Sequence, residues 1–145
     1  MIKELLQNSV FQTVISATII FCLSQIIQNF ILEPILKYKK IIGEIDNKLK
    51  YYSNKMSKIL PKTVTQKTSE KIRELSCDLE SSYKQIPFNK FFVWIKIIPG
   101  KKAISDSSKS LIRVSNIVTD EKLNDEIKIF DEIEKIRNLL SIPEL

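Results

Sequence analysis

The chain contains no histidine, and it has only two cysteines and two glycines among its 145 residues. Without histidine there is no His-based catalytic triad, no His-ligated zinc site and no histidine pH switch. Two cysteines, Cys22 and Cys77, cannot supply a four-thiolate metal site. Gly43 and Gly100 are isolated from each other, so no glycine-rich phosphate-binding loop can be written. We therefore expect no metal, no cofactor and no enzymatic activity.

The composition is that of an ordered protein, with 43% hydrophobic and 28% charged residues. A chain of this length forms one modest core with one appendage. It is too short for a two-domain nucleotide-binding enzyme. The remaining acidic residues lie in lysine-rich helical stretches, where a solvated helix face is the simplest interpretation.

The longest apolar segment, residues 10–32, has 23 residues and no charge. A helix rises about 1.5 Å per residue, so a segment of this length crosses the ~30 Å hydrocarbon core of a bilayer. We predict a transmembrane helix over about residues 10–32, within an N-terminal segment 1–33. The alternative is a buried helix of a soluble bundle. Four amides favour that alternative because they are costly in lipid: Gln12, Gln25, Gln28 and Asn29.

A polar stripe crosses the predicted span. Thr18, Cys22, Gln25 and Asn29 are spaced 4, 3 and 4 residues apart and share one helical face. Hydrogen bonds between membrane helices contribute roughly 0.6 to 2 kcal/mol each, so the stripe favours a homo-oligomer or a helical partner. Alternatively, the amides lie near the interface and contact headgroup water.

Lysines are concentrated on one side of the span, where Lys37, Lys39 and Lys40 follow it, while the preceding segment has only Lys3. Basic residues beside a span stay on the cytoplasmic side. We therefore predict a single-pass protein of the inner (cell) membrane with its C-terminal domain in the cytoplasm. The start of the chain lacks a basic region and a cleavage site, so we expect the span to stay attached.

A basic juxtamembrane helix is predicted over residues 34–60, after Pro34 kinks or restarts the chain. Its apolar residues follow a 3/4 spacing typical of a coiled coil. This heptad seam either joins two chains or packs on later helices. Its central members are Tyr38, Ile42, Ile45, Leu49, Tyr52 and Met56. Pro61 should end the helix, and residues 62–69 are expected to form a polar linker.

Residues 61–145 are predicted to form a helical cytoplasmic domain. Helices are expected over residues 69–86, 102–118 and 120–141, and no alternating strand pattern appears. The fold class is therefore all-α: one N-terminal transmembrane helix followed by a cytoplasmic bundle of about four to five helices. The expected inward residues are Ile72, Leu75, Leu79 and Ile86; Ile104, Leu111, Ile112 and Val118; and Leu123, Ile127, Phe130, Ile133, Ile136 and Leu140.

An aromatic segment, residues 88–98, is too short to cross a bilayer. We predict that Phe91, Phe92 and Trp94 contact the membrane surface, together with Lys37, Lys39 and Lys40. Burial in the core is the competing interpretation, because a small bundle needs large side chains.

Charge is unevenly distributed. Residues 36–68 hold nine lysines and two acidic residues, a net charge of +7, whereas residues 119–145 have a net charge of −4. The basic block suits an anionic membrane surface, and the acidic final helix is expected to pair with it. Ordinary solvated helix surface explains both blocks equally well.

Three stretches, LEPILKYKKIIGEI, RELSCDLESSYKQIP and SKSLIRVSNIV, occur in this order after the span. Together they resemble a set of uncharacterised small bacterial membrane proteins with one N-terminal span and a helical cytoplasmic part. The resemblance covers about residues 30 to 118. It implies a bacterial source and no particular activity.

Two functions compete on this basis. The first is a membrane-anchored, non-enzymatic interaction or structural protein that presents its helical domain to an unknown protein partner. The second is a membrane-perturbing effector, a toxin or antiviral pore former that assembles through its transmembrane helix. Nucleic-acid binding is not expected, because the basic residues flank a span and the membrane already explains them.

Overall fold

The computed structural model describes residues 9–53, 62–119 and 126–142, and the regular structure in these ranges is helical. The predicted all-α class is confirmed. In chain order the elements are α2 (Ser9–Ile27), the π-helical turn η1 (Gln28–Leu32), α3 (Glu33–Ser53), α4 (Lys62–Gln85), α5 (Asn89–Trp94), α6 (Lys101–Thr119) and α7 (Glu126–Leu140).

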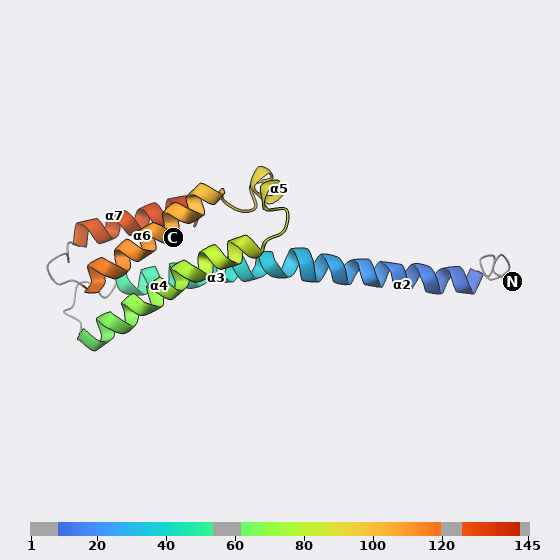
Figure 1. Cartoon of the computed structure of the whole chain (residues 1–145), viewed down its shortest axis with the longest axis horizontal. Helices are drawn as coiled ribbons and strands as arrows, with labels where there is room; N and C mark the ends of the chain where they lie inside the picture. Colours follow the sequence, from blue (N-terminus) through green and yellow to red (C-terminus); the bar gives the residue numbers. More distant parts are fainter. Residues whose placement is uncertain (1–8, 54–61, 120–125, 143–145) are drawn as a thin grey trace.

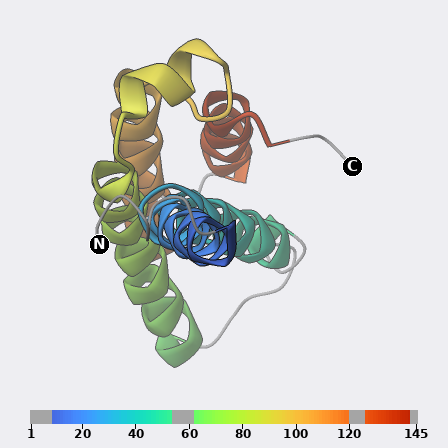
Figure 2. The same cartoon turned by 90° about the vertical axis from the view of Figure 1, so that its right-hand side faces the viewer.

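Helices α3, α4, α6 and α7 form an antiparallel bundle in which successive helices are neighbours. Helix α4 packs against α3 and α6, α7 packs against α6, and a smaller contact between α7 and α3 closes the bundle. Helix α2 extends from one end of this bundle, and α5 lies at that same end (Figure 1). The view along α2 shows α5 crossing the end of the bundle (Figure 2).

The chain does not restart at Pro34, because helix continues from Ser9 to Ser53. Within η1 the backbone widens, and the Glu33 N–H donates to the Gln28 carbonyl five residues earlier. A wider turn accommodates the proline ring and the hydrogen bond that proline cannot donate. The apolar helix and the bundle are therefore joined without a linker.

The heptad seam of α3 is covered by helices of the same chain. Tyr38, Ile45, Leu49 and Tyr52 are buried, and Ile42 is half-buried against the same core. Met56 lies outside the described residues. A second chain would have to displace α4 or α7 to reach these side chains, so the structure gives the seam an intramolecular role.

The expected polar linker is wrong, because residues 62–69 belong to α4. The Tyr52 hydroxyl of α3 donates to Thr68 Oγ1, which donates to the Val64 carbonyl at 2.6 Å. Thr68 and Ser69 are both buried. Threonine has a modest helix propensity, and these tertiary contacts override it.

Most of the apolar residues predicted to face inward do so. The buried members are Ile72, Leu75 and Leu79 of α4, Ile86 directly after α4, Ile104 and Leu111 of α6, and Ile133, Ile136 and Leu140 of α7, while Val118 is half-buried. Ile112 and Phe130 are exposed, so their inward placement was wrong. Each lies on the outer flank of a helix whose opposite side already fills the core. Leu123 and the side chain of Ile127 lie outside what the structure describes.

Small polar residues line the contact between α4 and α6. Buried serines on the two helices let their backbones approach closely, because serine adds little volume. Ser76 Oγ lies 3.0 Å from the Ser108 carbonyl and 2.8 Å from Ser108 Oγ. At the far end of the contact, Arg73 donates to Ser115 Oγ at 3.1 Å and to Asn116 Oδ1 at 2.7 Å.

We expect Ser76→Leu to destabilise the bundle, because the larger side chain cannot fit between α4 and α6. Overpacking of this kind costs about 1–3 kcal/mol. Thermal unfolding of the full chain in mild detergent, followed by far-UV circular dichroism, measures the loss. Cys77→Leu is the matched control, because Cys77 is the exposed neighbour of Ser76. Equal stability of the two variants would contradict close packing at Ser76.

Ion pairs fix α7 against its neighbours. Arg113 of α6 lies 3.1 Å from Glu132 of α7, and Arg137 of α7 lies 3.2 Å from Asp46 of α3. Lys50 approaches the same Asp46 carboxylate at 2.6 Å. In this described contact the acidic residue, Asp46, comes from the basic helix α3, and the basic residue, Arg137, comes from the acidic helix α7. The contact is therefore opposite in polarity to the pairing expected from the net charges.

Glu132 provides a pH test of this packing. Burial alone would raise the pKa of Glu132, but the nearby Ser110 hydroxyl and the hydrogen bond from the Arg113 guanidinium lower it below its ordinary value. A carboxyl group whose pKa is lower in the folded state than in the unfolded state stabilises the fold at pH values above its unfolded-state pKa. This stabilisation is lost as the pH falls through the folded-state pKa.

We expect Glu132→Gln to cost about 1 kcal/mol at neutral pH and to flatten the acid side of the stability profile. Denaturant unfolding of the full chain between neutral and strongly acidic pH measures both effects. Glu134→Gln is the control, because Glu134 is an exposed acid of the same helix. An unchanged acid limb in Glu132→Gln would show that this pair does not contribute.

Candidate membrane-contact surface

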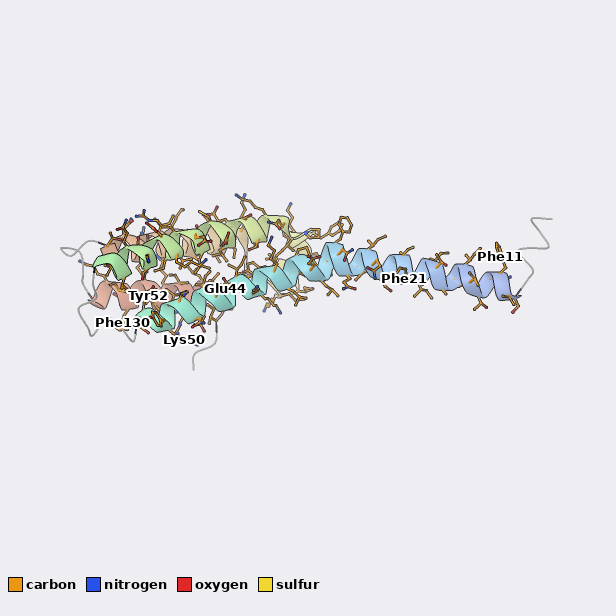
Figure 3. The ribbon with its side chains drawn as sticks, turned by 90° about the horizontal axis from the view of Figure 1, so that it is seen from below. Phe11, Phe21, Glu44, Lys50, Tyr52 and Phe130 are labelled. Atoms are coloured by element: carbon orange, nitrogen blue, oxygen red, sulfur yellow. The ribbon has the colours of Figure 1, made fainter. Side chains whose placement is uncertain are left out.

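Among the described residues, no helix of the bundle packs along the apolar helix α2. None of its residues is buried, and its exposed side chains include Val10, Val14, Ile19, Ile20, Phe21, Leu23, Ile26 and Ile27. Phe21 projects from the helix with no other segment beside it (Figure 3). The alternative of a helix buried in this chain's own bundle is therefore wrong. The helix is long and apolar enough to cross a membrane.

Three hydroxyl groups of α2 donate to backbone carbonyls of the same helix. Thr18 Oγ1 donates to the Val14 carbonyl at 2.9 Å, and Ser24 Oγ donates to the Ile20 carbonyl at 2.8 Å. Thr18 therefore needs no hydrogen bond from a second helix. Of the predicted stripe, Cys22, Gln25 and Asn29 are exposed side chains, so the two amides are the members that can bond to a partner.

Helix α5 is one short turn anchored on one side and exposed on the other. Phe88 adopts a left-handed conformation with φ 50°, which turns the chain from α4 into α5. Phe92 is only 8% exposed and belongs to the core, whereas Phe91 and Trp94 are 53% and 77% exposed. Phe88, the first residue of the segment predicted to rest on the membrane surface, is also exposed.

Core burial therefore holds for Phe92, whereas the membrane-surface interpretation stays a prediction for the exposed part of the aromatic segment. Phe92 was wrongly predicted as a membrane-surface residue, because a helical turn that caps a bundle must present one side to the core. Phe91 and Trp94 have the exposure that the prediction requires, and Trp94 does not fill the core. The aromatic surface is defined here as Phe88, Phe91 and Trp94.

The predicted lysines lie in the first turns of α3, at the same end of the bundle as the aromatic surface (Figure 1). Lys37, Lys39 and Lys40 are exposed. Lys37 Nζ donates to Gln85 Oε1 of α4 at 3.1 Å. At about 1.5 Å per residue, these lysines lie roughly 8–12 Å beyond Leu32, the last residue of the apolar segment. A lysine side chain at that distance from the apolar segment can extend back toward lipid headgroups.

A groove of about 590 Å³ opens between the first turns of α3, the segment after α5 and the end of α7. We call it the end groove. It is lined by Tyr38, Lys39, Ile42, Val93, Lys96, Ile97, Ile98, Pro99, Gly100, Leu140 and Ser141. Sequence analysis missed it, because no local pattern brings these three segments together.

The backbone of the end groove is shaped by two left-handed residues, Lys96 with φ 60° and Ser141 with φ 54°. After α7 the Ser141 N–H bonds to the Asn138 carbonyl and the Ile142 N–H to the Arg137 carbonyl. This pattern is a Schellman motif, which satisfies carbonyls at a helix end.

Tyr38 forms part of the groove wall and is 1% exposed. Its hydroxyl has no hydrogen-bond partner among the residues that the structure describes. Burial raises the pKa of Tyr38 far above its ordinary value, and the adjacent Tyr83 raises it further. The hydroxyl therefore stays protonated and can donate a hydrogen bond.

Comparisons of the chain with protein-family models, with curated proteins and with solved structures find no match. The resemblance to small bacterial membrane proteins stays a prediction. Within residues 9–53, 62–119 and 126–142, no three acidic or cysteine side chains are grouped to hold a metal ion.

We expect Trp94 fluorescence to be quenched by spin labels on lipid headgroups when the full chain is reconstituted in vesicles, because Trp94 is exposed at the end of the bundle from which α2 extends (Figure 1). It is the only tryptophan, so the measurement needs no correction. The matched control is Trp94→Phe combined with Phe130→Trp, because Phe130 is exposed at the opposite end of the bundle (Figure 3). Lipid quenching of the control equal to that of Trp94 would contradict a specific contact.

Proposed function

We propose that this chain is a non-enzymatic protein anchored in a bacterial inner membrane, with α2 crossing the bilayer and the four-helix bundle presented in the cytoplasm to a protein partner. One observation carries the proposal. A single helix from Ser9 to Ser53 is apolar and unburied in its first half and forms part of a packed core in its second half.

The apolar half of this helix fits lipid better than water. Its large hydrophobic side chains are left uncovered by the described part of the chain. A continuous apolar surface of this kind is unusual on a soluble monomer and marks a membrane or protein contact. Its charge-free length matches a bilayer, which favours the membrane.

The orientation rests on charge. The lysine block begins directly after the apolar segment, and in the structure its first members are exposed around α3. Basic residues in this position are retained on the cytoplasmic side, where they also meet anionic headgroups. The bundle therefore lies in the cytoplasm in this proposal.

The partner-facing part of the proposal is the outer surface of α6 and α7. Ile112 and Phe130 are exposed there. A hollow of about 350 Å³ on the same two helices is lined by Arg113, Asn116, Ile117, Lys128, Asp131 and Glu132. Exposed aromatic and arginine side chains with a polar rim are typical of protein contacts.

The two native cysteines allow a direct test of the anchor and its orientation. Cys22 lies in the proposed span, and Cys77 is exposed on α4. In a Cys22→Ser variant we expect a membrane-impermeant maleimide to leave Cys77 unlabelled in intact spheroplasts and to label it after permeabilisation.

The matched control places the thiol on the other side of the membrane. Ser9→Cys in a chain lacking both native cysteines should be labelled in intact spheroplasts, because Ser9 begins α2 and is exposed. The reverse pattern would overturn the orientation. Recovery of the full chain in the soluble fraction would overturn the anchor itself.

A further inference from the structure

The end groove combines cationic and apolar groups at the end of the bundle where α2 enters it. We propose that it binds the headgroup and upper acyl chains of one anionic phospholipid from the surrounding bilayer. This inference rests on the proposed membrane anchor and assigns the anchor a specific lipid contact.

The position of the groove suits a lipid of the adjacent leaflet. Lys39 and Ile42 follow Leu32 by roughly 10 to 15 Å along the helix axis. The headgroup layer occupies about 5–7 Å on each side of the hydrocarbon. An extended lysine side chain covers much of the remaining distance, so a phosphate in that layer is within reach of the groove.

The charge of the groove favours an anion. Lys39 of α3 and Lys96 after α5 approach it from different elements. The lining contains no aspartate or glutamate, and neither lysine is paired with a carboxylate within the described part of the chain. Gly100, which accepts the first backbone bond of α6 from Ile104 at 3.2 Å, is also part of the wall. The free N–H groups of the first turn of α6 add a favourable dipole.

The remaining walls favour a lipid over a free phosphate ion. Six lining residues are apolar: Ile42, Val93, Ile97, Ile98, Pro99 and Leu140. The volume of about 590 Å³ lies in the range of small-molecule sites and far exceeds what one phosphate fills.

The test uses the full chain reconstituted in vesicles with equal amounts of phosphatidylglycerol and phosphatidylcholine. Native mass spectrometry after release measures the ratio of the two lipids that remain bound. We expect a preference for phosphatidylglycerol in the wild-type protein. Lys39→Gln combined with Lys96→Gln should lower that ratio roughly twenty-fivefold, about fivefold for each lysine.

Two further variants test whether the lipid preference depends on the groove or only on the net charge of the protein. Lys67→Gln with Lys135→Gln removes the same charge from exposed positions outside the groove, and its lipid ratio should stay at the wild-type value. Gly100→Phe keeps both lysines and adds bulk at a groove position where a Cβ meets no atom within 4 Å, so the ratio should fall.

Each outcome decides between the proposals. An equal loss in both lysine pairs, or an unchanged ratio in Lys39→Gln with Lys96→Gln, would overturn the lipid site while leaving the anchor intact. Displacement of bound phosphatidylglycerol by soluble glycerophosphate would identify a site for a free phosphate instead. Failure of the wild-type chain to float with vesicles would overturn the anchor, and the lipid site with it.

Discussion

The structure depends on one constraint, the unbroken helix from Ser9 to Ser53. Its first half has no buried side chain, and its second half supplies the buried seam to which α4 and α7 attach. No flexible linker separates the two halves, so the direction of the apolar helix and the direction of the bundle are set together. The π-helical turn before Pro34 makes this continuity possible, because its wider hydrogen bonds accommodate a residue without an N–H.

The bundle around this helix is held by two different kinds of contact. Large apolar residues such as Leu79 and Ile136 fill the core, while serines let α4 and α6 approach closely. Ser76 and Ser108 are each satisfied across that contact, so the small polar residues are buried at little cost. The ion pair between Arg113 and Glu132 then fixes the position of α7 along α6.

The end of the bundle near α2 is where the proposed functions converge. The turn α5 covers the core with Phe92 and exposes Trp94, so one short element both closes the bundle and offers an aromatic surface. Lys39 and Lys96 lie in the end groove beside it. In the proposed arrangement these groups face the lipid surface, and the outer faces of α6 and α7 are left for a partner protein.

The sequence by itself determined the all-α class, the long apolar helix and most of the core, because hydrophobic periodicity depends only on local spacing. The burial of Leu49, Leu75 and Ile133 follows directly from that spacing. Only the tertiary structure decided that residues 62–69 are helical, since contacts such as that of Thr68 with Tyr52 override local propensity. The tertiary structure also placed Phe92 in the core and left Trp94 exposed, and it formed the end groove. Both features depend on which distant segments meet, and local periodicity carries no information about those contacts.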